Sequence, residues 1–135
     1  MNVVLDTNVA AYHLLATEPF CHAAGRFLRA GHTLYAPASW AAELTNVLWP
    51  ATRHGVLDPL VAQQKLALAR ALNVTLAPAF DEAEAALALA TAHDHPAYDT
   101  VFVALARRLK APLATWDRAV LAKFPDVARR PNELT

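Results

Sequence analysis

Four carboxylates are candidates for a functional site, because each lies at a position in the sequence where it could bind a ligand: Asp6, Glu43, Asp99 and Asp117. Asp6 follows the apolar run VVL, and Asp117 follows LATW, so each is expected at the carboxyl end of a short strand. Open α/β sheets form their ligand crevices at the carboxyl ends of strands. Asp6 and Asp117 are therefore predicted to face one crevice, although either alone could equally cap the helix that follows it.

Glu43 lies on the apolar side of the helix that is expected to begin after Pro37. The apolar stripe of this helix consists of Trp40, Leu44, Val47 and Leu48. A carboxylate within such a stripe costs several kcal/mol unless it is paired, protonated or bound to a metal. Glu43 is thus a candidate metal ligand, and an arginine partner is the structural alternative.

Asp99 lies in the segment HPAYDTVFVALARRL, near the predicted start of another helix, with Pro96 close to its first turn. An acid at this position also suits the helix dipole, so Asp99 alone has a structural explanation. The four acids together point further, because clustered carboxylates repel one another unless a cation binds them. Ligand sets made only of oxygen favour Mg²⁺ or Mn²⁺ over zinc, which indicates phosphoryl chemistry.

Short apolar runs rich in branched residues alternate with helical patterns, which predicts an α/β fold with a parallel sheet covered by helices on both faces. Nothing divides the chain, so a single domain over residues 1–135 is expected. Asp58 with Pro59, and Asp81 with Glu84, are predicted to start helices. The expected strands are Val3 to Leu5, Thr33 to Ala36, Val74 to Ala77 and Leu113 to Thr115, with a fifth near Val127. The expected core includes Trp40, Trp49 and Trp116.

Composition narrows the class of protein. The single cysteine, Cys21, cannot form an internal disulfide, and no signal peptide or bilayer-spanning stretch is evident, so a soluble cytoplasmic protein is expected. The net charge of zero argues against binding of nucleic acid through bulk positive charge. Basic residues crowd the C-terminal third and are predicted to be solvated helix faces or a local phosphate-binding rim: Arg107, Arg108, Lys110, Arg118, Lys123, Arg129 and Arg130.

The sequence resembles the PIN-domain family, specifically the VapC-type toxins of bacterial and archaeal toxin-antitoxin pairs. The resemblance spans nearly the whole chain and is carried by four segments in the family's order. These are VVLDTNV with Asp6, AAELTNVL with Glu43, YDTVFVALA with Asp99, and LATWD with Asp117.

The resemblance implies a PIN-like three-layer α/β/α fold with a central parallel sheet of four or five strands in the order 3-2-1-4-5. It implies that the four acids are catalytic metal ligands, and that Thr7, Asn8 and Thr115 orient them. It also implies a Mg²⁺- or Mn²⁺-dependent endoribonuclease that leaves 5′-phosphate and 3′-hydroxyl ends, dimerises and binds a cognate antitoxin protein. Many relatives carry another acid two positions after the one matching Asp117, where this chain has Ala119. A second metal would therefore bind more weakly.

Three other functions compete with this one. A nuclease with histidine acid–base catalysis would use His93 and His95, which flank Asp94, and would be insensitive to EDTA. These histidines are expected to be exposed at a helix end, and they lack the spacing of a zinc site. A non-catalytic PIN-like module would bind RNA or protein, but it has no use for four repelling acids. A receiver-type signalling domain would need an aspartate directly after the third strand, where Pro78 stands.

Overall fold

A five-stranded, all-parallel sheet forms the centre of the computed structural model, which describes residues 1–135. The strand order is β3-β2-β1-β4-β5, which confirms the predicted order and fold class. The expected strand positions hold to within about two residues, the usual uncertainty of element ends. The strands are β1 (Asn2–Leu5), β2 (Thr33–Pro37), β3 (Thr75–Ala77), β4 (Leu113–Ala114) and β5 (Ala128–Arg129).

The central strand β1 is apolar because helices cover both of its faces. Val3, Val4 and Leu5 are completely buried. On one side β1 pairs with β2, and on the other side it pairs with β4, where Leu5 lies opposite Ala114. The residues that follow β1 and β4 must therefore emerge side by side at the same edge of the sheet. Chain order reverses between these two strands, and such a reversal leaves a crevice.

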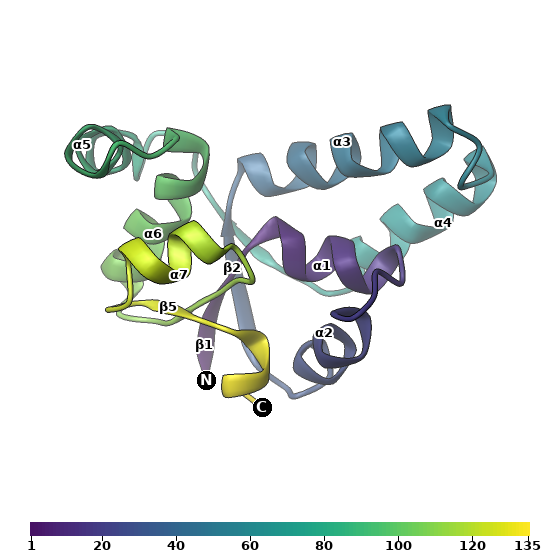
Figure 1. The fold of residues 1–135 in the computed structure, drawn as a ribbon, viewed down its shortest axis with the longest axis horizontal. Coiled ribbons are helices and arrows are strands. Elements are labelled where there is room, and N and C mark those ends of the chain that lie inside the picture. The colour runs from purple at the N-terminus through teal and green to yellow at the C-terminus, as the bar shows by residue number, and fades with distance from the viewer.

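Helices form a layer on each side of the sheet (Figure 1). One layer consists of α1 (Thr7–Leu14), α2 (Cys21–Leu28), α3 (Ser39–Arg53) and α4 (Pro59–Arg70). The other layer consists of α5 (Ala83–His93), α6 (Ala97–Leu109) and α7 (Arg118–Lys123). A short 3₁₀ helix, Pro131–Glu133, follows β5 and contacts α2. None of the helices combines the length and the hydropathy that a bilayer crossing requires.

Two predicted helix starts have different outcomes. Asp58 caps α4 as expected, with its side chain accepting from the Leu60 amide and Pro59 in the first turn. The predicted capping box of Asp81 and Glu84 is wrong, because α5 begins at Ala83 and Glu82 occupies its N-cap position without a side-chain capping bond. Glu82 instead turns inward, where it is 2% exposed and forms an ion pair with Arg108.

One of the three tryptophans differs from expectation. Trp40 is buried and Trp116 packs against the core, as predicted. Trp49 is 58% exposed on α3, so its prediction as a core residue is wrong. The helical spacing puts Trp49 one position after Leu48, which turns its side chain away from the buried stripe.

Candidate metal site

All four predicted acids line one pocket at the carboxyl edge of the sheet. Asp6 directly follows β1, and Asp117 lies at the N-cap of α7 just beyond β4. Glu43 comes from the second turn of α3, and Asp99 from the first turn of α6. The pocket has a volume of about 350 Å³ and is also lined by Thr7 and Asn8. Since a water molecule in the liquid occupies roughly 30 Å³, a hydrated ion and a phosphate group fit together.

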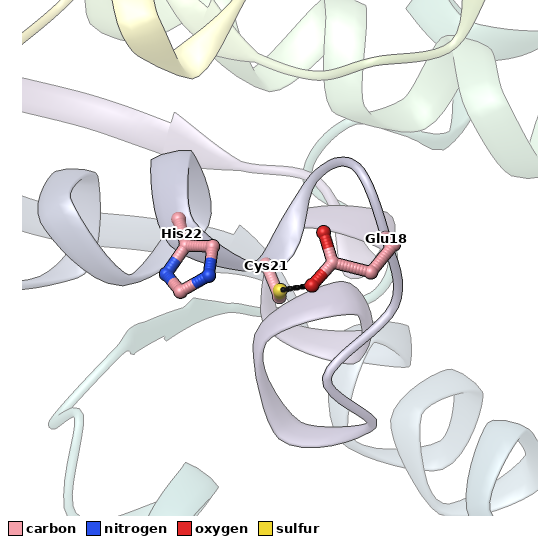
Figure 2. A group of neighbouring side chains, drawn as sticks. All are labelled: Glu18, Cys21 and His22. Carbon is pink, nitrogen blue, oxygen red and sulfur yellow. Dashed lines mark hydrogen bonds between the residues drawn. The ribbon is translucent and has the colours of Figure 1, made fainter.

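The pocket is open rather than a closed coordination shell. No three of its carboxylates bring oxygens within 4.8 Å of one another. Elsewhere, a carboxylate oxygen of Glu18, the thiol of Cys21 and a ring nitrogen of His22 do lie within that distance of one another (Figure 2). That second group lies at the start of α2, and its thiol and imidazole are softer donors than magnesium prefers. The spacing of the pocket acids suits Mg²⁺, which keeps several waters and binds directly to only one or two carboxylates.

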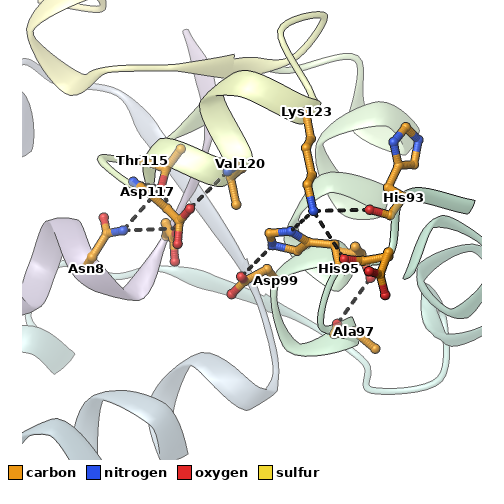
Figure 3. A network of polar contacts seen from close by, with 12 residues as sticks. Asn8, His93, His95, Ala97, Asp99, Thr115, Asp117, Val120 and Lys123 are labelled. Carbon is orange, nitrogen blue, oxygen red and sulfur yellow. Dashed lines mark hydrogen bonds and ion pairs between the residues drawn. The ribbon is translucent and has the colours of Figure 1, made fainter. Parts of the chain in front are cut away.

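Thr115 and Asn8 hold Asp6 and Asp117 in one network. The Thr115 hydroxyl donates to Asp6 Oδ2 at 2.7 Å and accepts from the Asp117 amide at 3.0 Å. The Asn8 side-chain amide donates to the Thr115 hydroxyl at 3.2 Å and to Asp6 Oδ2 at 3.3 Å. Figure 3 shows Asn8, Thr115 and Asp117 together on adjoining segments. A hydroxyl offers one donor and two acceptor positions, so Thr115 uses its full capacity.

Glu43 is held by Thr7 and has no arginine partner. The Thr7 hydroxyl donates to Glu43 Oε2 at 2.7 Å, which ties α3 to the first residue of α1. The alternative of an arginine ion pair for Glu43 is wrong, because the ion pairs of the molecule involve other acids. Thr7 is itself buried, so this bond holds Glu43 at the pocket wall.

The aspartates on α6 and α7 have different partners. Asp117 Oδ1 accepts from the Val120 amide at 2.9 Å and therefore caps α7, as its structural alternative predicted. Asp99 Oδ2 accepts from His95 Nε2 at 2.7 Å, and His95 Nδ1 lies 3.3 Å from Lys123 Nζ (Figure 3). His95 is only 8% exposed, so its expectation as an exposed histidine is wrong. Sequence reasoning missed this contact, because His95 lies in the turn between α5 and α6 and no helical spacing relates it to Asp99.

Burial and mutual repulsion disfavour negative charge in the pocket. Burial is the main cause that raises the pKa of Asp6 to about 7, with further increases from the charges of Asp99 and Glu43 and an opposing effect of the Thr115 hydrogen bond. Burial also raises the pKa of Glu43, and Asp99 adds to this effect. A cation at this place would relieve both the burial cost and the repulsion.

Each acid keeps one oxygen without a protein partner. Asp6 Oδ2, Glu43 Oε2, Asp99 Oδ2 and Asp117 Oδ1 accept the hydrogen bonds described above. The other oxygen of each carboxylate accepts no hydrogen bond of standard geometry from the protein. Four free oxygens around one pocket form a donor set that fits a hard divalent cation.

The basic residues near the C-terminus are mostly engaged within the molecule. Arg107 pairs with Asp126, Arg108 with Glu82, and Arg130 with Glu133. Arg129 donates to backbone carbonyls, and so does Lys123. Among these basic side chains, only those of Arg118 and Lys110 form no hydrogen bond or ion pair within the molecule, and both residues are exposed. These residues therefore do not form a continuous phosphate-binding rim. Next to the pocket, only Arg118, which directly follows Asp117, remains available to bind a phosphate.

The comparison with protein families agrees with this geometry. The family model described as PIN domain matches residues 3–129, which is nearly the whole chain. No curated protein matches the chain. The chain therefore belongs to the PIN domain family, whose members are generally nucleases and typically use divalent metals.

Proposed function

We propose that this protein is a Mg²⁺-dependent endoribonuclease, active also with Mn²⁺, and that Asp6, Glu43, Asp99 and Asp117 are its metal ligands. The observation that carries the proposal is the convergence of four carboxylates on one pocket, each with one oxygen left free. Membership of the PIN domain family supports nuclease activity. Ribonuclease specificity and the identity of the metal are the parts that we infer.

The residues around the pocket would prepare it for this chemistry. Thr115 and Asn8 hold Asp6, and Thr7 holds Glu43, so that the free oxygens need little reorganisation. A bound Mg²⁺ would polarise the scissile phosphate and lower the pKa of the attacking water. Arg118, exposed beside Asp117, is available for an adjacent phosphate of the RNA.

The direct test is cleavage of single-stranded and structured RNA by purified protein with Mg²⁺, with Mn²⁺ and with excess EDTA. We expect cleavage with either metal and none with EDTA, and loss of cleavage in Asp6→Asn and Asp117→Asn. Asp58→Asn is the matched control, because Asp58 caps α4 away from the pocket. Cleavage that persists in EDTA would favour histidine catalysis, and RNA binding without cleavage under any condition would favour the non-catalytic module.

We further propose that the protein is the toxin of a VapBC-type pair, forms a homodimer and is inhibited by an antitoxin protein. Large exposed apolar side chains support protein contacts: Trp49, Val56, Leu60 and Leu68 on and between α3 and α4, and Phe80, Leu87 and Tyr98 near α5 and α6. Light scattering of the purified protein should give the mass of a dimer. Expression of the active protein alone should arrest growth, whereas expression of Asp6→Asn should not. A monomer whose expression is harmless would contradict these assignments.

A further inference from the structure

His95 is a nearly buried polar side chain beside the pocket. It lies between α5 and α6, and its side chain is only 4% exposed. Both ring nitrogens have partners, Asp99 Oδ2 on one side and Lys123 Nζ on the other (Figure 3). The ring also meets Phe124 edge-on, with centroids 5.9 Å apart. Neither the family match nor the resemblance assigns a role to this residue.

Lys123 determines which ring nitrogen of His95 carries the proton. An ammonium group has donors only, so Nδ1 must accept from Lys123. The proton of the neutral ring is then on Nε2, which donates it to Asp99. Lys123 is held in turn by the carbonyls of His93 and Asp94, at 3.1 and 3.2 Å. Lys123 therefore donates a hydrogen bond to His95, and His95 donates one to Asp99.

The same short helix supports two of the proposed ligands. Asp117 is the N-cap of α7, and Lys123 is its last residue. One end of α7 thus carries a pocket acid itself, and the other end reaches a second pocket acid through His95. Asp99 has few other restraints, since its side chain is 37% exposed and accepts only the bond from His95.

We propose that His95, oriented by Lys123, is a positioning residue that occupies Asp99 Oδ2 and leaves Oδ1 free for the metal ion. This inference rests on the proposed function, because it assumes that Asp99 is a ligand. Without His95, the Asp99 carboxylate would rotate among several rotamers, and ordering it would oppose metal binding. Partners of this kind typically change metal affinity by about 10- to 100-fold.

The test measures Mn²⁺ affinity by calorimetry, independently of cleavage. We expect His95→Leu to weaken Mn²⁺ binding by about tenfold or more, and His95→Gln, whose amide can still donate to Asp99, to restore much of it. His54→Leu is the matched control, because His54 is exposed at the end of α3. Wild-type Mn²⁺ affinity in His95→Leu would overturn the inference.

A double-mutant comparison separates positioning of Asp99 from a general effect on the fold. If His95 acts through Asp99, His95→Leu should have little further effect on Mn²⁺ affinity in an Asp99→Asn background. An equal loss in both backgrounds would overturn the inference and leave His95 a purely structural role.

Two further observations keep the proposal testable if His95→Leu does not fold. Nitrogen NMR of the wild-type ring should show the proton on Nε2, and a proton on Nδ1 alone would overturn the inference. Lys123→Met should weaken Mn²⁺ binding less than His95→Leu does but more than His54→Leu does. An unchanged Mn²⁺ affinity in Lys123→Met would overturn the role of Lys123 in orienting His95. If the wild-type protein binds no Mn²⁺, the proposed function is overturned as well. If the wild type and the His95 variants bind Mn²⁺ and cleave RNA equally, only this inference is overturned.

Discussion

Each pocket carboxylate accepts its hydrogen bonds on one oxygen and keeps the other oxygen free, an arrangement that opposes folding while no cation is bound. Asp6 bears most of this effect, because it is the acid whose pKa rises furthest. The hydrogen-bond donors that hold the acids reduce the free-energy cost of burying their charge. They do not remove this cost, because the free oxygens lack partners. The stability of the metal-free protein should therefore respond to pH and to neutral substitutions in the pocket.

The first prediction concerns Asp6 and pH. Between 3.8 and about 7 the unfolded chain has lost the Asp6 proton while the folded protein retains it, so stability in EDTA should fall as pH rises through this range. Each pH unit of full difference in protonation corresponds to about 1.4 kcal/mol. Urea unfolding at several pH values should show a shallower decline for Asp6→Asn than for wild type. Parallel profiles for wild type, Asp6→Asn and the control Asp58→Asn would contradict this assignment.

The second prediction concerns Asp99→Asn, which keeps an oxygen that can accept from His95. Removal of this charge lessens the repulsion that raises the pKa of Asp6 and Glu43. The melting temperature without metal should therefore hold or rise by a few degrees, for a change of about 1 kcal/mol. Cleavage should be lost, together with much of the stabilisation that Mg²⁺ adds. Wild-type cleavage and an equal Mg²⁺ shift in both proteins would remove Asp99 from the ligand set.

Strand position sufficed to predict that Asp6 and Asp117 share the pocket, whereas Glu43 and Asp99 were included for their helix positions and for the family resemblance. Asp6 and Asp117 follow apolar strands, and parallel strands deliver such residues to one edge. The contacts that hold Glu43 and orient His95 could not be derived in the same way. Thr7 reaches Glu43 across 36 positions, and Lys123 reaches His95 across 28, so these contacts depend on how helices pack. A single sequence carries no periodic signal for such pairs.

At the scale of elements, α5 and α6 form the most extensive helix pair and are joined by an ion pair that is buried on its acidic side only. Glu82 precedes α5 and is almost fully buried, while Arg108 approaches it from the last turn of α6. The pattern of Asp81 and Glu84 suggested a capping box, but burial decided otherwise. Glu82 therefore turns inward to an arginine and makes no capping bond at this helix start.

The third prediction follows from this ion pair. Arg108→Met should destabilise the protein more than Asp81→Ala does, because it leaves the carboxylate of Glu82, whose side chain is 3% exposed, without its partner. Asp81→Ala should change stability by less than about 0.5 kcal/mol, since Asp81 caps nothing. Urea unfolding compares the two variants directly. A larger loss in Asp81→Ala than in Arg108→Met would restore the capping interpretation.

At the scale of the whole molecule, zero net charge conceals an uneven distribution. Four of the twelve acids gather at the carboxyl edge of the sheet, and most cations near the C-terminus are neutralised by partners. Arg118 is free beside the pocket, whereas Lys110 is free just before β4, at the opposite edge. Attraction of RNA should therefore depend on few positions rather than on a broad basic surface.

The fourth prediction uses this pair of free cations. Arg118→Gln should weaken RNA binding and reduce the slope of log affinity against log salt by about 1, as expected for one lost phosphate contact. Lys110→Gln removes the same charge from the far edge and should leave the salt slope unchanged. Binding of a short labelled RNA in EDTA, at several salt concentrations, measures both variants without cleavage. Equal slopes in the two variants would show that Arg118 does not contact the RNA.

The pairing of β1 with β4 determines when the pocket can form during synthesis of the chain. Asp6 is synthesised well before the residue whose hydroxyl holds it, because Thr115 lies 109 positions later. Contacts of such long sequence separation form late, because closing the intervening loop costs entropy before any pairing repays it. A growing chain on the ribosome can therefore fold β1, β2 and their helices while the pocket still lacks Thr115 and Asp117. Under the proposed function, a nascent chain would be unable to cut the RNA that surrounds it until almost all of the domain had emerged.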